Sequence, residues 1–152
     1  MRILIDTNIL IHLEDNRVID EQFAKFYQFA NANKCDIYFH PACLRDLKRD
    51  KNKDRQEITR SKLSKYTQMP DPANPTVEFI ESVGQKKEND EIDNLQLFQV
   101  TKGYVDYFIT EDKGIYDKAA KINLKNKVLS ISDCLKILKD KYTLIIPQNH
   151  LL

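Results

Sequence analysis

Short apolar runs alternate with helical patterns along most of the chain. Runs of four to six mainly apolar residues predict strands. They are RILI (2–5), DIYF (36–39), VDYFIT (105–110) and KVLSI (127–131). The first run is apolar in nearly every position, as expected of a strand buried on both faces. Strands alternating with helices predict an α/β fold, a three-layer α/β/α sandwich with a central parallel sheet of four to five strands.

The segments between these strands have apolar residues three and four positions apart, which predicts helices. The predicted helices cover 8–14, 20–33, a stretch that begins near Pro41 and carries Leu44 and Leu47, 55–66, 76–83, 89–102, 113–122 and 132–140. Asp20, Asn89 and Ser132 are expected to cap their helices, and Gly84 and Gly103 to end theirs. The three prolines of MPDPANP (69–75) predict a rigid loop.

The 152 residues are enough for one domain, which we place at residues 1–140. The tail, residues 141–152, is apolar and is broken by Pro147. Two interpretations of the tail stay open. It forms a last edge strand of the sheet, or it marks the boundary with a further C-terminal domain.

The composition points to a soluble protein of a reducing compartment, with a cytoplasmic location expected. No run of about 18 apolar residues predicts a membrane span. The apolar N-terminus contains Asp6 and has no basic segment before it, which argues against a signal peptide. The cysteines are Cys35, Cys43 and Cys134, an odd number without CxxC spacing, so we expect free, buried thiols and no structural zinc.

Charge is unevenly distributed although the formal net charge is only +1. Residues 45–65 contain nine Lys or Arg against four Asp or Glu. This local excess is suited to contacts with phosphates. The interleaved acids leave the alternative of a solvated helical surface with pairs of opposite charge one turn apart.

Carboxylates gather where the predicted strands end. Asp6 follows the first strand directly, and Asp112 comes two residues after the third. Asp90 and Asp93 lie in the first turn of the predicted helix 89–102. In a parallel sheet these positions meet at the carboxyl edge, where several carboxylates need a counter-ion. All-oxygen ligands favour Mg²⁺ or Mn²⁺. The simpler alternative is that these acids cap or begin their helices.

Four segments together resemble the PIN-domain nucleases. They are LIDTNIL, LRDL on the helix after the second strand, NDEID and FITEDKGI, and the resemblance runs from residue 2 to about residue 139. It implies that Asp6, Asp90 and Asp112 hold Mg²⁺ or Mn²⁺ and that Asp93 extends this cluster. Asn8 and Thr110 would orient the carboxylates through hydrogen bonds.

The resemblance also assigns residues on the following helices. Asp46 takes the place of a glutamate that the family has among its catalytic acids, one methylene shorter. Lys48, Arg49 and Lys53 are the candidates for phosphate contacts.

The function implied is that of a metal-dependent endoribonuclease. The resemblance is greatest to single-domain bacterial members, among them the toxins of toxin–antitoxin pairs, and to modules fused ahead of an acetyltransferase domain. RNA, an antitoxin-like protein and a second copy of the chain are therefore the expected partners, with no membrane. The alternative is a PIN fold that binds RNA or protein without cutting.

Three other α/β classes fit the sequence less well. A dehalogenase-like phosphatase needs a second aspartate at position 8, which is Asn8. A receiver domain needs a phosphorylated aspartate after the third strand and a later lysine at a strand end. A dinucleotide-binding fold needs GxGxxG, and the three glycines stand apart at 84, 103 and 114.

Overall fold

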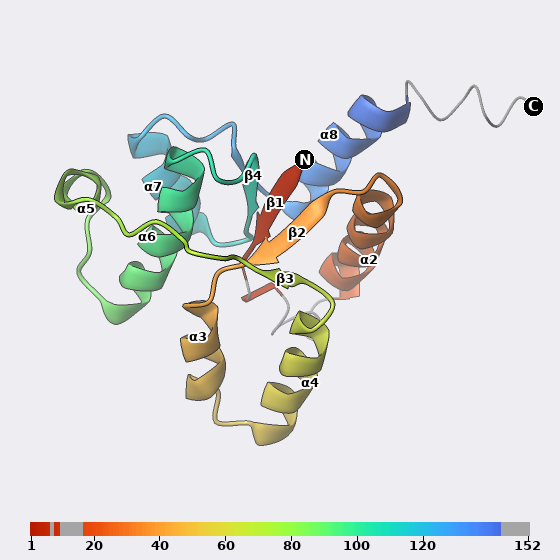
Figure 1. The fold of residues 1–152 in the computed structure, drawn as a ribbon, viewed down its shortest axis with the longest axis horizontal. Coiled ribbons are helices and arrows are strands. Elements are labelled where there is room, and N and C mark those ends of the chain that lie inside the picture. Colours follow the sequence, from red (N-terminus) through yellow and green to blue (C-terminus); the bar gives the residue numbers. More distant parts are fainter. Residues whose placement is uncertain (7, 10–16, 144–152) are drawn as a thin grey trace, which may run out of the picture.

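The computed structural model describes residues 1–6, 8–9 and 17–143, in which five strands and seven helices are seen (Figure 1). In chain order these are β1 (Arg2–Ile5), α2 (Arg17–Ala32), β2 (Asp36–Phe39), α3 (Cys43–Arg49), α4 (Lys53–Leu63), β3 (Thr67–Gln68), α5 (Val77–Val83), α6 (Glu88–Thr101), β4 (Tyr107–Ile109), α7 (Lys113–Lys121), β5 (Val128–Leu129) and α8 (Ile131–Thr143).

All five strands are parallel, in the order β3-β2-β1-β4-β5. The central strand β1 pairs Leu4 with Tyr38 of β2 on one side and with Phe108 of β4 on the other. Its residues Ile3, Leu4 and Ile5 are almost completely buried. The predicted α/β fold with a parallel sheet is therefore confirmed.

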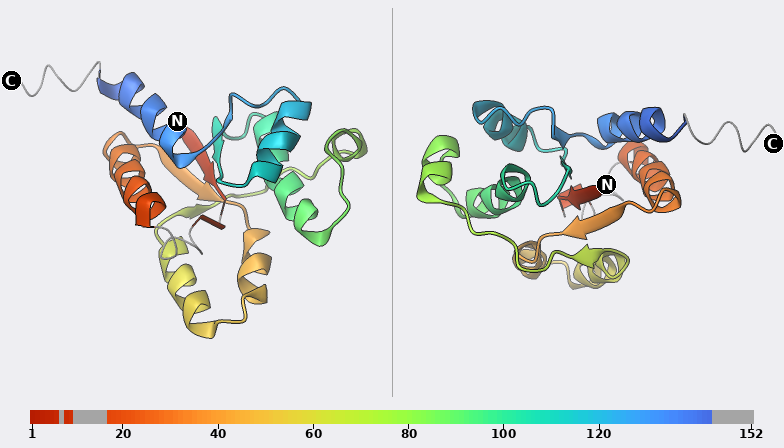
Figure 2. Two further views of the ribbon diagram at one scale, coloured as in Figure 1. Left: turned by 180° about the vertical axis from the view of Figure 1, so that it is seen from behind. Right: turned by 45° about the horizontal axis from the view of Figure 1, so that its top comes forward.

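The two faces of the sheet are covered by different helices, as the two views in Figure 2 show. Ile3 and Ile5 belong to a core that includes residues of α2 and α8. Leu4 points to the other face, because side chains alternate along a strand, and packs with residues of α5, α6 and α7. These two helical layers and the sheet between them make the three-layer sandwich.

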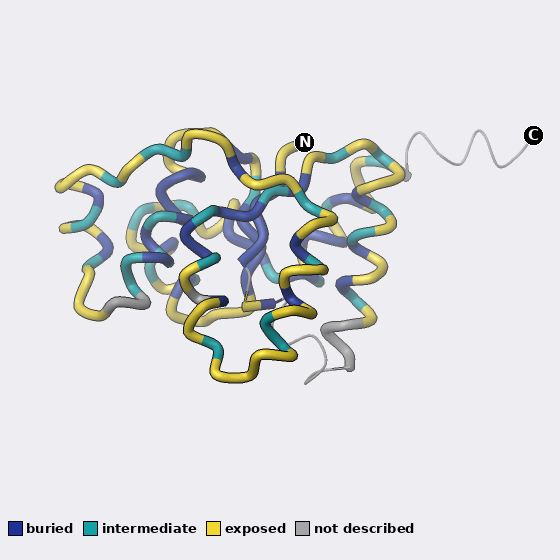
Figure 3. The backbone as a smooth tube through the Cα atoms, turned by 60° about the horizontal axis from the view of Figure 1, so that its bottom comes forward, coloured by how far each residue is buried: buried dark blue, intermediate teal, exposed yellow. Residues whose placement is uncertain are grey.

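Helices α3 and α4 project beyond the edge toward which β1 and β2 point (Figure 1). We call residues 43–63 the α3–α4 arm. Its turn is held by Arg55, which donates from Nε and Nη2 to the carboxylate of Asp50 at 2.6 and 2.9 Å. Asn52 caps α4 by accepting from the backbone N–H of Arg55. The outer part of the arm is largely exposed (Figure 3).

Several predicted helix starts are wrong by one to three residues. Asp20 lies inside α2, which begins at Arg17, and α3 begins two residues after Pro41. α6 begins at Glu88 with Lys87 as its N-cap residue, so Asn89 is not the cap. α8 begins at Ile131, with Ser130 accepting from the N–H of Asp133, so Ser132 is inside the helix.

The sequence also missed strand β3 and the extent to which helix α6 is buried. The two-residue strand β3 was not predicted, since Thr67 and Gln68 are polar and exposed. Helix α6, expected to be amphipathic, is buried on almost every side in its second half, including its polar residues Gln96 and Gln99. Most of the predicted helix 8–14 and residues 144–152 of the tail lie outside the described residues.

Two further findings concern membrane spans and the cysteines, for which burial was expected and is seen at two of the three. Among the described residues, no helix is both long and apolar enough to cross a bilayer. The three cysteines are free thiols: Cys43 and Cys134 are buried, and Cys35 is partly exposed.

Candidate active site

The residues that directly follow β2, β1 and β4 form a row at the carboxyl edge of the sheet. Asp6 donates its backbone N–H to the carbonyl of Ile109 at 2.9 Å, which continues the β1–β4 pairing by one step. Thr110, which follows β4, therefore lies beside Asp6 on one side. The β1–β2 register continued by one residue places His40, which follows β2, on the other side of Asp6. We call His40, Asp6 and Thr110 the carboxyl-edge row.

The row faces the layer of α5, α6 and α7. Leu4, Tyr38 and Phe108, two positions earlier on the three strands, all pack in the core of that layer. Because side chains two positions apart share a face, the row points the same way. All three members of the row are buried polar residues, which is uncommon at a sheet edge unless they are paired or used.

Asp6 is tied to Thr110 and, through it, to Asp112. The Thr110 hydroxyl donates to Oδ2 of Asp6 at 2.7 Å and accepts from the backbone N–H of Asp112 at 3.1 Å. Oδ1 of Asp6 accepts from the backbone N–H of Asn8 at 3.2 Å. Asn8 thus contacts the Asp6 carboxylate through its backbone N–H.

Asp112 caps α7, because its Oδ1 accepts from the N–H of Gly114 at 2.8 Å. A Cβ at Gly114 would lie 3.1 Å from this oxygen, so glycine there lets the backbone approach the carboxylate closely. Capping and a functional role are compatible, since a carboxylate has lone pairs for more than one partner.

Tyr116 of α7 helps to fix the same segment. Its hydroxyl donates to the carbonyl of Thr110. Burial first, and then nearby carboxylates including those of Asp112 and Asp6, raise the pKa of Tyr116 to about 12. The phenol therefore stays protonated and acts here as a donor.

Asp93 of α6 is the acid most affected by the others. Burial, followed by the charges of Asp6 and Asp112, raises the pKa of Asp93 to about 7, and Asp90 adds a smaller effect in the same direction. No hydrogen bond to the Asp93 carboxyl is seen among the described residues. The charges of Asp6 and Asp112 therefore act on the Asp93 carboxyl.

Asp90 is differently placed from the prediction. Its Oδ2 accepts from the backbone N–H groups of Lys86 and Lys87, both at 3.0 Å, and its Oδ1 accepts from Nζ of Lys118 at 3.1 Å. The hydrogen bond from Lys118, and then that from Lys86, hold the pKa of Asp90 below its ordinary value. Asp90 therefore accepts hydrogen bonds from the backbone just before its own helix. Asp6 and Asp112 act on the pKa of Asp93, while the pKa of Asp90 is set by Lys118 and the backbone.

Lys118 of α7 is the functional candidate that the sequence did not reveal. Besides Asp90, its Nζ donates to Oδ1 of the buried Asn94 at 3.0 Å, and its charge opposes the rise in the pKa of Asp93. These contacts join α7 to α6 across 24 and 28 positions. No local pattern links residues so far apart, although a lysine on the helix that Asp112 begins is a weak pointer.

The remaining predicted residues lie on the α3–α4 arm. Lys48, Arg49 and Lys53 are exposed there, beyond the carboxyl edge. Asp46 is part of α3, but its side chain lies outside what the structure describes.

The donor set suits a hard divalent cation, because carboxylate oxygens are what Mg²⁺ and Mn²⁺ prefer. Crowded carboxylates with a raised pKa are also what such an ion would relieve. Yet within residues 1–6, 8–9 and 17–143, no three His, Cys, Asp or Glu side chains are grouped closely enough to hold a metal ion. The charges of Asp6 and Asp112 thus raise the pKa of Asp93, but the described side chains are not arranged as a set of metal ligands.

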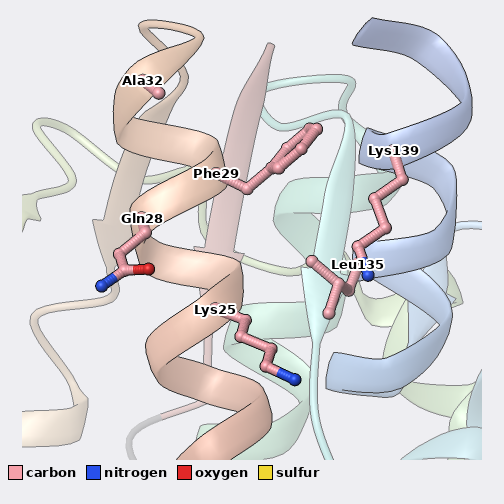
Figure 4. Close-up of a pocket in the computed structure, with 6 residues that line it drawn as sticks. All are labelled: Lys25, Gln28, Phe29, Ala32, Leu135 and Lys139. Atoms are coloured by element: carbon pink, nitrogen blue, oxygen red, sulfur yellow. The ribbon is translucent and has the colours of Figure 1, made fainter. Parts of the chain in front are cut away.

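A hollow elsewhere lacks this chemistry. It lies between α2 and α8, on the opposite face of the sheet (Figure 4). It is lined by Lys25, Gln28, Phe29, Ala32, Leu135 and Lys139. None of these side chains is an acid or a nucleophile of the kind that hydrolysis needs.

Comparisons with protein-family models, with curated proteins and with solved structures find no match to this chain.

Proposed function

We propose that this protein is a metal-dependent nuclease of the PIN type that cuts RNA at its carboxyl-edge acids. The observation that supports this most is the raised pKa of Asp93, caused by burial and by the charges of Asp6 and Asp112. Acids whose pKa is shifted by burial together with specific charged neighbours are enriched at functional sites.

Asp6, Asp93 and Asp112 would hold Mg²⁺ or Mn²⁺. Such an ion supplies an activated water and neutralises charge that develops on a phosphate. Thr110 orients two of the three acids, since its hydroxyl contacts the Asp6 carboxylate and the Asp112 main chain. Lys118 holds the Asp90 carboxylate at the start of α6 and lowers its pKa, so Asp90 is not needed as a ligand in this proposal.

The substrate assignment is supported by charge beyond this edge. Exposed cations on the α3–α4 arm, among them Lys48, Arg49 and Lys53, are suited to the phosphates of a nucleic acid strand. RNA is preferred to DNA because of the likeness to PIN ribonucleases. A toxin of a toxin–antitoxin pair is one form of this activity, and it predicts growth arrest on expression that Asp93→Asn abolishes.

The test combines metal binding with cleavage. Mn²⁺ is expected to raise the melting temperature of the wild-type protein and to support cleavage of single-stranded RNA. Both effects should be lost in Asp93→Asn. Asp106→Asn, at the opposite edge of the sheet, is the matched control and should keep both. Wild-type protein that neither gains stability from Mn²⁺ nor cuts RNA would refute the nuclease.

The second candidate is a PIN-like fold that binds RNA or a protein without cutting. It is favoured by the open grouping of the acids, since no three of the described side chains are arranged to hold a metal. It is also favoured by Lys118, a cation built into the chain beside Asp90. RNA binding that is independent of Mn²⁺ and unchanged in Asp93→Asn would support this candidate.

A further inference from the structure

His40 is a buried residue of the carboxyl-edge row that the proposed chemistry does not use. It is 3% exposed and directly follows β2, on the strand next to Asp6. Its side chain shares a face of the sheet with the Asp6 carboxylate, because Tyr38 and Leu4, two positions earlier, pack in the same core. No sequence motif marked His40 as a candidate.

The tautomer of His40 is fixed by the main chain. The backbone N–H of Ala42 donates to Nδ1 at 3.0 Å, so Nδ1 is the acceptor. Burial, and then the charge of Arg45, lowers the pKa of His40 to about 4. The ring is therefore neutral at pH 7 and has its only proton on Nε2.

This protonation state excludes two ordinary roles of histidine. Nε2 carries a proton and has no lone pair for a metal ion, so His40 is not a ligand in this arrangement. A ring with so low a pKa is also a poor general base at neutral pH. What remains is a neutral N–H donor.

That donor, the Nε2–H group, is buried and has no hydrogen-bond partner among the described residues. Native proteins rarely leave a buried donor unpaired without a polar ligand or an ordered water nearby. The neighbouring positions on this face are Asp6 after β1 and Met69 after β3, on strands about 4.8 Å away, and of the two only Asp6 carries a carboxylate.

We propose that His40 is a positioning residue for Asp6, with its Nε2–H donating to a bound water that in turn donates to the Asp6 carboxylate. Nε2 makes no direct hydrogen bond to Asp6. A water that makes two hydrogen bonds of about 2.8 Å, one to each side chain, can bridge His40 and Asp6 on the neighbouring strands. Thr110 then holds Asp6 from the β4 side and His40 from the β2 side, so the carboxylate is fixed from both neighbouring strands. A role of this His40–water–Asp6 bridge in catalysis rests on the proposed nuclease function.

Two substitutions separate the two nitrogens of the ring. His40→Asn keeps an oxygen at the place of Nδ1, which still accepts from the N–H of Ala42, but it removes the Nε2 donor. His40→Gln places an amide N–H as many bonds from Cα as Nε2 is, without the acceptor. His40→Asn is therefore expected to fold normally and to lose the positioning, and His40→Gln to restore part of it.

The decisive measurements are Mn²⁺ affinity and single-turnover RNA cleavage in the wild type and both variants. His40→Asn should weaken Mn²⁺ binding or cleavage by about 10–100-fold, as losses around metal ligands do. His40→Gln should recover at least part of that loss. His40→Asn that is folded and has wild-type affinity and rate would overturn the proposal.

A second measurement stands apart from activity. Nitrogen-15 NMR of the wild-type imidazole at pH 7 should show the neutral ring protonated on Nε2, and a high-resolution crystal structure should show a water shared by Nε2 and Asp6. A ring protonated on Nδ1, or a protein acceptor at Nε2, would overturn the proposal even if no variant folds. If the wild type neither binds Mn²⁺ nor cuts RNA, the nuclease fails, while these two observations still decide whether His40 positions Asp6.

Discussion

Asp106 at the amino edge of the sheet and Asp93 near the carboxyl edge have opposite surroundings. At the amino edge, Asp106 accepts from the backbone N–H of Arg2 at 2.7 Å and donates its own N–H to the Arg2 carbonyl at 2.8 Å. The Arg2 guanidinium reaches the Gly103 carbonyl at 2.9 Å in the same corner. At the carboxyl edge, Asp93 accepts no hydrogen bond among the described residues and faces two other acids.

This contrast separates a structural carboxylate from one that folding alone does not explain. Asp106 joins β1 to β4 at an exposed corner, where its carboxylate meets solvent and accepts a backbone hydrogen bond. Asp93 is partly buried beside like charges, which disfavours its ionised form. A residue whose surroundings disfavour its charged form lowers the stability of the fold, and such residues are expected at functional sites.

The largest effect is expected from removing the charge of Asp93. Asp93→Asn should lower the rate of Mn²⁺-dependent RNA cleavage by about 100-fold or more, since losses even around metal ligands reach that size. Single-turnover kinetics with a fluorescent single-stranded RNA measures it. A rate within a few-fold of wild type would remove Asp93 from the site, whatever the result at the amino edge.

The next largest effect is expected from Lys118, whose side chain links α7 to α6. Lys118→Met removes the donor to Asp90 and to the buried Asn94, and it should lower the free energy of unfolding by about 1–3 kcal/mol. Urea denaturation measures the change. Lys121→Met, at an exposed position of the same helix, is the control and should change it by less than about 0.5 kcal/mol. Equal effects of the two substitutions would argue against a structural role for the Lys118 contacts.

The third prediction is a pH dependence of the metal-free protein. The pKa of Asp93 is about 7 in the folded state against 3.8 in the reference state, so the folded protein binds more protons between these values. Stability from this group is therefore present at low pH and falls as pH rises from about 4 through about 7. Thermal melts of wild type and Asp93→Asn in chelator should diverge over this window, with the variant less sensitive to pH. Parallel curves would contradict the raised pKa.

The smallest effect is expected at the amino edge. Asp106→Asn keeps an oxygen that accepts from Arg2, so the free energy of unfolding should change by less than about 1 kcal/mol. Mn²⁺ binding should stay as in wild type. A large loss of either property would mean that the two edges are not as different as their contacts indicate.

The sequence predicted β1 and β2 best. RILI and DIYF were predicted to the residue, because in each an exposed charged residue is followed by three apolar or aromatic residues that are buried or partly buried. The strand β3 has only Thr67 and Gln68, whose polar side chains give no such pattern, and its pairing with β2 depends on the chain that returns from the α3–α4 arm.

The sequence grouped Asp6, Asp90, Asp93 and Asp112, but it mistook where Asp90 lies on α6. Asn89 was expected to cap this helix, with Asp90 directly after it. With Lys87 as the N-cap residue, Asp90 is at the third helical position, where its carboxylate turns back to the N–H groups of Lys86 and Lys87. Helix starts depend on such local hydrogen bonds, which composition alone does not fix.

His40 and Lys118 were beyond prediction for a related reason. A histidine after a strand gives no sign of which nitrogen is bonded, and that depends on the turn at Ala42. A lysine in the middle of a helix gives no sign of a partner 28 positions away. Both roles arise from tertiary contacts.

A crystal structure of the protein soaked with Mn²⁺, with anomalous scattering to locate the ion, tests the central claim most directly. We predict a Mn²⁺ peak with carboxylate oxygens of Asp6, Asp93 and Asp112 around it, at about 2.1–2.2 Å, close to the distance that Mg²⁺ prefers. An ion bound by Asp90 instead, or no ion at the carboxyl edge at saturating Mn²⁺, would contradict the account.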